Sequence, residues 1–256
     1  MTREARRLDR VNPHSGRKYV KTFEWMENLV YQNGIMPEIP PPRTEPLNGN
    51  HSLKAAAAER IREGIVLGVY PLGGRLSDKA LAQELEISRT PVREALLQLQ
   101  SEGLVVVRPQ SGTFVFDLSA DEVRDICEVR AMFERTAVLI GAARDRQSLV
   151  GTLVALVAEA SFALEDGDFA RCEKLDTAFH EAIIAGSRNR YLIASYRSIS
   201  DKVGALRHRL PQSHDRVSRA IGQHRRIVDF IAAGRVEAAA AELASHVANV
   251  HAQLSG

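Results

Sequence analysis

Cysteine is almost absent from this sequence, which has only two among its 256 residues. Cys127 and Cys172 lie far apart and neither belongs to a C-x-x-C motif, which argues against a disulfide framework and against a cysteine metal site. Cysteine usage of this kind is typical of a protein that works in a reducing cytoplasm.

Long hydrophobic runs are missing as well. No stretch of 18 or more apolar residues without a charge occurs, and the basic start MTREARRLDRV is not followed by the apolar segment of a signal peptide. We therefore expect a cytoplasmic protein with no membrane partner.

Aromatic residues make up only 5% of the chain, and Ala, Leu, Val and charged residues dominate. This composition favours helices over sheets, so we expect a mostly α-helical protein. The length allows one large domain or two ordinary ones, with enough apolar residues for a core.

The formal net charge of +2 shows no strongly basic domain. Residues 1–50 hold eight Lys and Arg against six Asp and Glu, whereas residues 51–118 hold eight of each kind and residues 119–256 eighteen of each. Binding to a nucleic acid would therefore depend on where individual basic residues lie and not on a strongly basic domain.

Residues 1–50 combine basic residues with the proline-rich stretch PEIPPPRTEP, a composition that resists a packed core. We expect a flexible extension and linker there, with one short helix near residues 22–32. The extension is either an arm that adds phosphate contacts or a solvated tail or overlong gene start.

Residues 51–117 follow the order of a winged helix-turn-helix. Ser52, Ser77 and Ser88 each precede a helical pattern as an N-cap, and Pro91 falls in the first turn of the third helix. The segment YPLGGRL reads as a turn after the first helix, and LVVVRP and TFVF read as a two-stranded hairpin. Three short helices followed by a hairpin predict this DNA-binding module.

Arg89 and Arg93 lie four residues apart at the start of the third helix, away from its apolar stripe. In a winged helix this end enters the major groove, so both side chains would face base edges and phosphates. The alternative is that they form exposed ion pairs, for instance with Glu94 or Glu86.

The stretch LGGRLSDKALAQELEISRTPVREALLQLQSEGLVVVRPQSGTFV resembles the DNA-binding domain of the GntR family. The resemblance covers about 65 residues and includes the SRTPVREAL segment at the start of the third helix. It implies that operator DNA is contacted by Lys79, Arg89, Thr90, Arg93 and the wing-tip Gly112.

The second half of the chain has the pattern of helices alone. Ser119 and Glu122 form an S-x-x-E capping box at its start, and short connections such as DGD and GSRN imply antiparallel neighbours. We therefore expect an all-α antiparallel bundle of six helices. They are predicted at residues 121–143, 148–165, 169–185, 190–209, 215–233 and 236–254.

Four polar residues stand on apolar stripes of this predicted bundle. Asp176 and His180 are four apart on one helix, and His224 and His246 lie on two others. Each alone is typical of a hydrogen-bonded core residue. Together, three imidazoles and a carboxylate match the ligands of a divalent transition metal: zinc is expected, and nickel, manganese or cobalt also accept this set.

Residues 119–254 resemble the FCD effector-binding domain of the FadR subgroup of GntR regulators. The segments EVRAMFE, DTAFHEAIIAGSRNRYL and QHRRIVDFIAAGRVEAAAAELASHV carry the resemblance. It implies a metal site at Asp176, His180, His224 and His246. Six predicted helices in place of seven make the chain more similar to the VanR-type branch.

Arg130 falls at a core-facing position of the first bundle helix, where an unpaired guanidinium is costly. Its partner is either Glu134 or Asp176, or else the carboxylate of an effector, which the planar fork of Arg fits. Asn189 is a second effector-binding candidate, although an Asn at a helix start is ordinarily a cap.

These expectations combine into a homodimeric transcription regulator, a repressor that binds a palindromic operator in double-stranded DNA. A small organic acid held by the metal and Arg130 would act as effector. One alternative is a metal sensor in which the metal itself is the signal. A metalloenzyme is the other, but no H-E-x-x-H or similar signature supports it, so we expect no enzymatic activity.

Overall fold

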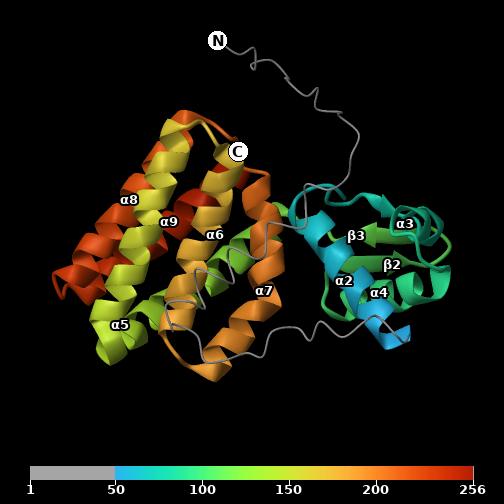
Figure 1. Cartoon of the computed structure of the whole chain (residues 1–256), viewed down its shortest axis with the longest axis horizontal. Helices are drawn as coiled ribbons and strands as arrows, with labels where there is room; N and C mark the ends of the chain where they lie inside the picture. The colour runs from blue at the N-terminus through green and yellow to red at the C-terminus, as the bar shows by residue number, and fades with distance from the viewer. Residues whose placement is uncertain (1–49, 256) are drawn as a thin grey trace, which may run out of the picture. The chain divides into compact units, whose positions relative to one another are not determined.

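The computed structural model of the chain describes residues 50–255 (Figure 1). The extension before residue 50 lies outside them, and so does the helix expected near residues 22–32. All described residues belong to one compact unit of the chain.

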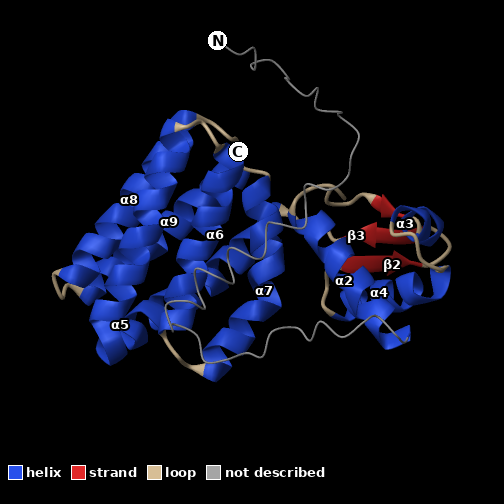
Figure 2. Cartoon of the chain, viewed as in Figure 1, coloured by secondary structure: helices blue, strands red, loops and turns tan. Residues whose placement is uncertain are grey.

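The N-terminal part of the described chain is a winged helix-turn-helix with a small sheet (Figure 2). Its strands pair antiparallel in the order β1-β3-β2, with Val106 opposite Phe114 in the hairpin. The predicted hairpin is confirmed, but the interpretation of YPLGGRL as a turn alone was wrong. Its last two residues form a strand on the free edge of β3, and a two-residue strand is too short to show a periodic pattern. The elements are α2 (Asn50–Val66), β1 (Arg75–Leu76), α3 (Asp78–Glu84), α4 (Arg89–Ser101), β2 (Val105–Arg108) and β3 (Gly112–Val115).

Two of the three serine caps predicted for this module stand at helix starts. The third prediction was wrong, because α2 begins at Asn50 and already contains Ser52. Oγ of Ser77 accepts a hydrogen bond from the backbone N–H of Ala80 and caps α3, as the sequence predicts. Ser88 occupies the N-cap position of α4 without a side-chain cap bond. Pro91 lies in the first turn of α4, where a helix needs no N–H donor. Ser88 and Pro91 therefore mark the start of α4 in the sequence.

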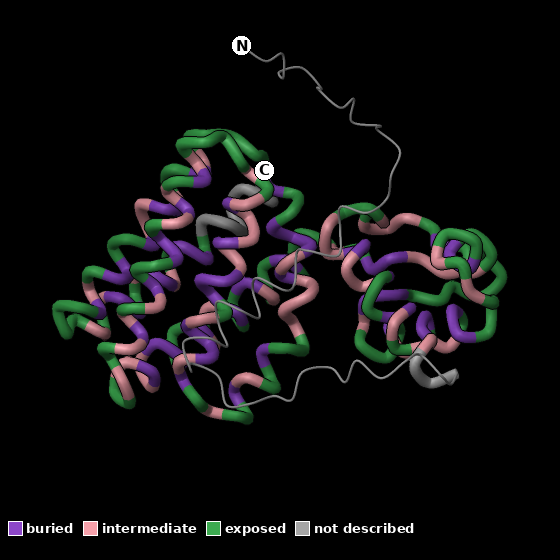
Figure 3. The backbone as a smooth tube through the Cα atoms, viewed as in Figure 1, coloured by how far each residue is buried: buried purple, intermediate pink, exposed green. Residues whose placement is uncertain are grey.

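The core of this module lies between α2, α4 and the sheet (Figure 3). Helix α4 turns one apolar side inward and leaves Arg89 and Arg93 exposed on another. Burial of the apolar side fixes the rotation of α4 and therefore the direction of the arginines. The largest completely buried side chains of this core are Ile61, Ile65, Leu99 and Leu104.

The C-terminal part is an all-helical bundle, as predicted. Ser119 and Glu122 form the expected capping box at its start. The first two predicted helices form one element with a kink at Asp145, whose φ of −158° and ψ of 77° break the helix. The Asp145 carboxylate then accepts from the backbone N–H of Ser148 and caps the second half. The elements are α5 (Ala120–Glu165), α6 (Phe169–Gly186), α7 (Arg190–His208), α8 (His214–Ala232) and α9 (Val236–Ser255).

Helix α5 is the central element of the bundle. Among the described helices it is long and apolar enough to cross a membrane by length and composition, with a window of mean hydropathy 1.6. The core helix of a soluble protein passes the same test. Here α5 packs against α6, α8 and α9, and its residues Leu153 and Ala163 are completely buried. The bundle core accounts for only part of the apolar character of α5, because 39% of that window is buried.

Candidate metal centre and nucleic-acid interface

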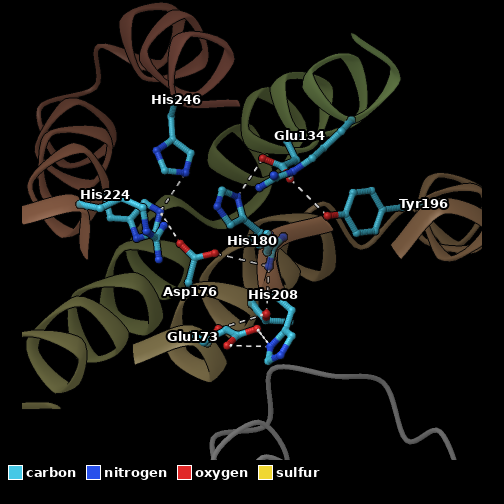
Figure 4. Close-up of polar contacts among 12 residues, drawn as sticks. Glu134, Glu173, Asp176, His180, Tyr196, His208, His224 and His246 are labelled. Atoms are coloured by element: carbon cyan, nitrogen blue, oxygen red, sulfur yellow. Dashed lines mark hydrogen bonds and ion pairs between the residues drawn. The ribbon is translucent and has the colours of Figure 1, made fainter. Parts of the chain in front are cut away.

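The bundle brings together the four polar residues that the sequence singled out (Figure 4). Asp176 and His180 come from α6, His224 from α8 and His246 from α9. One potential ligand atom from each residue lies within 4.8 Å of all the others. The three histidines are at most 4% exposed, whereas the Asp176 side chain is 24% exposed. Residues up to 70 positions apart in the sequence thus form one largely buried cluster.

The spacing of the ligand atoms fits a metal ion. Nε2 of His224 lies 3.4 Å from Nε2 of His246 and 3.5 Å from Oδ1 of Asp176. Two ligands about 2.1 Å from a tetrahedral zinc ion are about 3.4 Å apart, so these separations need little adjustment.

The protonation of two imidazoles is set by their outer partners. Nδ1 of His180 lies 2.8 Å from Oε2 of Glu134, and Nδ1 of His246 lies 3.0 Å from Oε1 of Gln223. Both acceptors place the proton on Nδ1 and leave the Nε2 lone pair free. Nε2 of His180 is buried and has no hydrogen-bond partner among the described residues. A buried acceptor left open in this way fits a metal ligand.

Burial and charge put the cluster in its metal-binding protonation state. Burial lowers the pKa of His224 to about 4 and those of His180 and His246 well below their ordinary value. Burial alone would raise the pKa of Asp176, but the guanidinium of Arg207 lowers it overall. At neutral pH the cluster therefore offers three neutral imidazoles and one carboxylate.

Glu134 joins the cluster to Arg130 and Tyr196. Its Oε1 accepts from Nε of Arg130 at 2.7 Å and from the Tyr196 hydroxyl at 3.2 Å, while its Oε2 faces His180. Of the partners that the sequence left open for Arg130, which were Glu134, Asp176 and an effector carboxylate, the structure shows Glu134. The contact between Glu134 and His180 was not predicted from the sequence. The spacing of four residues pairs Glu134 with Arg130, but only the fold shows which neighbouring helix Glu134 faces.

A cavity of about 700 Å³ opens beside the cluster. Asp176, His224 and His246 line it, together with Arg130 and Arg207. Asn189, the other effector-binding candidate, is outside this lining, and its Oδ1 accepts the backbone N–H groups of Tyr191 and Leu192. The geometry therefore gives Asn189 the capping role that its position predicts.

Arg89 and Arg93 at the start of α4 share one partner. The Asp78 carboxylate on α3 accepts from Nη2 of Arg89 at 2.9 Å and from Nε of Arg93 at 2.6 Å. Both arginines therefore form the exposed ion pairs that the sequence left open as an alternative, with Asp78 as partner in place of Glu94 or Glu86. Both arginine side chains remain more than half exposed, at 53% and 62%. They are held side by side and remain accessible.

These arginines line a second cavity of about 780 Å³ together with the wing. Gly112 lies on it with a φ of +120°, a backbone conformation that side chains other than glycine rarely adopt. A Cβ atom there would also lie 3.1 Å from Nε of Arg75. Arg75, missed by the sequence analysis, is thus a third cation on this face. Lys79 and Thr90 are exposed but are not part of the lining.

A winged helix with exposed arginines at its reading helix, followed by a helical bundle with a polar cavity, defines a DNA-binding transcription regulator. Residues 53–115 match the family "Bacterial regulatory proteins, gntR family", and residues 125–249 match the family "FCD domain". The chain belongs to the GntR family of regulators and carries an FCD domain.

Individual proteins agree with this assignment. The "Nta operon transcriptional regulator" of Aminobacter aminovorans is 31% identical over 179 residues, which are 68% of this chain and 81% of the relative. A protein of Paenarthrobacter nicotinovorans named "Probable D-xylose utilization operon transcriptional repressor" is 28% identical over 76% of this chain and 87% of its own. The solved structure of Escherichia coli McbR/YncC has the same fold, with a TM-score of 0.69 at 24% identity over 79% of this chain and 96% of its own. The protein is a transcription regulator and not an enzyme.

Proposed function

We propose that this regulator binds a palindromic operator as a homodimer, represses transcription, and releases DNA when a small organic acid enters the bundle. The observation that carries the proposal is the buried cluster of three histidines and Asp176 beside a cavity lined by arginines. The word "repressor" in the name of the Paenarthrobacter relative supports the sign of regulation. The cytoplasm is the compartment in which such a protein meets DNA.

The DNA contacts are assigned to the exposed face at the start of α4. Arg89 and Arg93 reach base edges and phosphates in the major groove, where Arg is well shaped for guanine. Thr90 and Lys79, which are both exposed, add further contacts, and Gly112 lets the wing approach the DNA backbone closely. Two copies related by two-fold symmetry read two half-sites.

The metal is assigned to Asp176, His180, His224 and His246. Zinc fits the nitrogen-rich set best, and nickel, manganese and cobalt are also compatible with it. When bound, the ion would supply a positive charge for a carboxylate, which would join the four protein ligands as a fifth. Arg130 adds a buried guanidinium to the same cavity, with Nη2 lacking a partner in the described chain. Asn189 contributes at most indirectly, through the start of α7.

Helix α7 connects this cavity to the DNA-binding module. Arg207 of α7 lies 3.5 Å from the Asp176 carboxylate, while Ala205 of α7 is buried in the core of the winged helix. Asp201 of α7 also pairs with Arg62 of α2 at 3.1 Å. A shift of Arg207 would therefore move α7 as a rigid helix and displace α2, which contacts it. This route adds to the covalent one through residues 116–119.

The number of bundle helices supports a proposal about the branch of FCD regulators to which the chain belongs. With the kink at Asp145, α5 to α9 give six helical segments. On this basis we propose the VanR-like branch for this chain, with the fatty-acyl-CoA-binding branch as the alternative.

DNA binding followed by fluorescence anisotropy tests the proposal. The full-length protein is titrated onto DNA from upstream of its own gene, and carboxylates are added to metal-loaded and chelated samples. We expect release by an acid only when the metal is bound. Binding that chelation alone abolishes would make the metal itself the signal. Binding that neither acid nor chelation changes would contradict a sensing role for the bundle. Light scattering checks that the DNA-bound species is a dimer.

A further inference from the structure

Two buried arginines in the cavity have donors without a partner. Among the residues that the structure describes, the buried side-chain atoms without a hydrogen bond are Nη2 of Arg130, Nε of Arg207 and Nε2 of His180. The first two belong to residues that line the cavity. They come from different helices, α5 and α7. An unpaired buried N–H is costly, so each points to a group that the cavity receives.

Arg207 differs from Arg130 in how its charge is balanced. Arg130 has Glu134 at 2.7 Å as its own counter-charge. The nearest carboxylate to Arg207 is that of Asp176, at 3.5 Å, and Asp176 belongs to the metal cluster. Thr177 accepts a hydrogen bond from Nη1 of Arg207 at 2.9 Å, which orients the guanidinium but brings no charge. Oδ1 of Asp176 faces His224, and a metal ion bound there would draw charge from the carboxylate, so the charge of Arg207 would be only partly balanced by Oδ2.

The other charged residues that line the cavity are also mostly basic. Arg216, Arg219 and Arg226 also line it, against Glu173 as the one further acidic residue. Arg226 is paired with Glu242, Glu173 contacts His208, and Glu181, outside the lining, interacts electrostatically with Arg207. The lining still holds more arginines than carboxylates. A volume of about 700 Å³ falls in the range of cavities that take small molecules.

We propose that Arg207 forms a second acid-binding subsite, so that the effector is an organic acid with two carboxylates. One carboxylate would meet the metal and Arg130, and the other would pair with the guanidinium of Arg207, which lines the cavity. Thr177 is the positioning residue for Arg207. The inference rests on the proposed function and specifies the chemical class of its effector. A monocarboxylate would leave the Arg207 donor unpaired, and buried sites discriminate strongly against ligands that leave a polar group unmatched.

Calorimetric titration of the metal-loaded full-length protein tests this assignment. The probes are straight-chain monocarboxylates of three to six carbons and the dicarboxylates of equal chain length, with malate and 2-hydroxybutyrate as a hydroxylated pair. We expect the best dicarboxylate to bind roughly tenfold or more tighter than its matched monocarboxylate. Arg207→Gln should remove this difference, and Thr177→Val should reduce it. Arg130→Gln should weaken both classes of acid.

Arg226→Gln is the matched control, because it removes an arginine of the same cavity that already has a carboxylate partner. It should keep the preference for dicarboxylates. Thermal unfolding and metal content of each variant identify those that are misfolded or lack metal. Equal binding of the two classes by the wild-type protein would overturn the inference, as would equal losses for both classes in a folded Arg207→Gln variant. Binding of neither class would also overturn it.

The two hypotheses fail differently in this experiment. A protein that takes up no metal, or whose DNA affinity no acid changes, contradicts the proposed function. A protein that holds metal and is released from DNA equally by both classes of acid contradicts only the second subsite.

Discussion

Oε2 of Glu134 on α5 lies 2.8 Å from Nδ1 of His180 on α6, and both side chains are completely buried. A carboxylate can only accept, so it holds the proton on Nδ1 and turns Nε2 toward Asp176 and the other histidines. This carboxylate also holds Arg130 and the Tyr196 hydroxyl. One side chain thus orients both a metal-ligand candidate and an effector-binding candidate.

Glu134→Gln tests this orienting role. The amide keeps the size of the side chain but loses the charge that fixes His180, and outer partners of this kind typically contribute about 10–100-fold to metal affinity. We expect a loss of that order in competition with a chromophoric zinc chelator. Breaking the buried pair with Arg130 also destabilises the fold by several kcal/mol, on the order of 3–5 for such pairs, so thermal unfolding is measured alongside. A folded variant with wild-type metal affinity would contradict the role.

Arg89→Ala and His224→Ala test whether the two sites are separate. Arg89 is exposed on the winged helix, and His224 is buried in the bundle. Arg89→Ala should lower specific DNA affinity by about 1–3 kcal/mol and leave metal content intact. His224→Ala should lower the metal content and leave specific DNA affinity intact in the absence of effector. Metal analysis and anisotropy on the same samples measure both properties. If each substitution damaged both, the assignment of two independent sites would fail.

Asp78→Asn probes the carboxylate that Arg89 and Arg93 share. Hydrogen bonds from Arg93 and Arg89 lower the pKa of Asp78, so the group is ionised in every ordinary assay. Removing its charge takes away a repulsion with phosphate but also the contact that holds the two guanidinium groups together. We expect tighter binding to scrambled DNA and a smaller ratio of specific to non-specific affinity. Anisotropy with operator and scrambled duplexes at several salt concentrations measures this ratio. An unchanged ratio would show that Asp78 does not orient the arginines.

Acid should destabilise the metal-free protein through the buried histidines. The pKa of His224 is lowered to about 4 in the folded state, whereas an unfolded histidine titrates near 6.5. Between these values the unfolded chain binds more protons, so the free energy of unfolding falls as pH falls through this window. Chemical denaturation of chelated protein between pH 7 and pH 4 measures the slope. His224→Gln should show a shallower slope, and an identical slope would exclude His224 as a contributor.

The sequence predicted those features that depend on local patterns. The capping box of Ser119 and Glu122, the boundary at Ser88 and the apolar stripes that turn His224 and His246 inward can all be read from spacing. Strand β1 was missed because two residues carry no period, and its pairing depends on the edge of β3. The bonds from Glu134 to His180, from Gln223 to His246 and from Asp78 to Arg93 join different helices. Such contacts depend on how the helices pack and leave no signal in a single sequence.

Asp201→Asn tests the route along α7. Asp201 pairs with Arg62 of α2, and Arg207, two turns further along α7, reaches the metal cluster. Removing the charge of Asp201 weakens the link between α7 and α2 without changing the cavity lining. We expect unchanged effector affinity by calorimetry, but a smaller drop of DNA affinity when effector is added. Such a result would give a lower coupling free energy between the two sites. Asp215→Asn is the control, since Asp215 is exposed at the start of α8. An effector response in Asp201→Asn that equals that of the control would exclude this ion pair from the coupling.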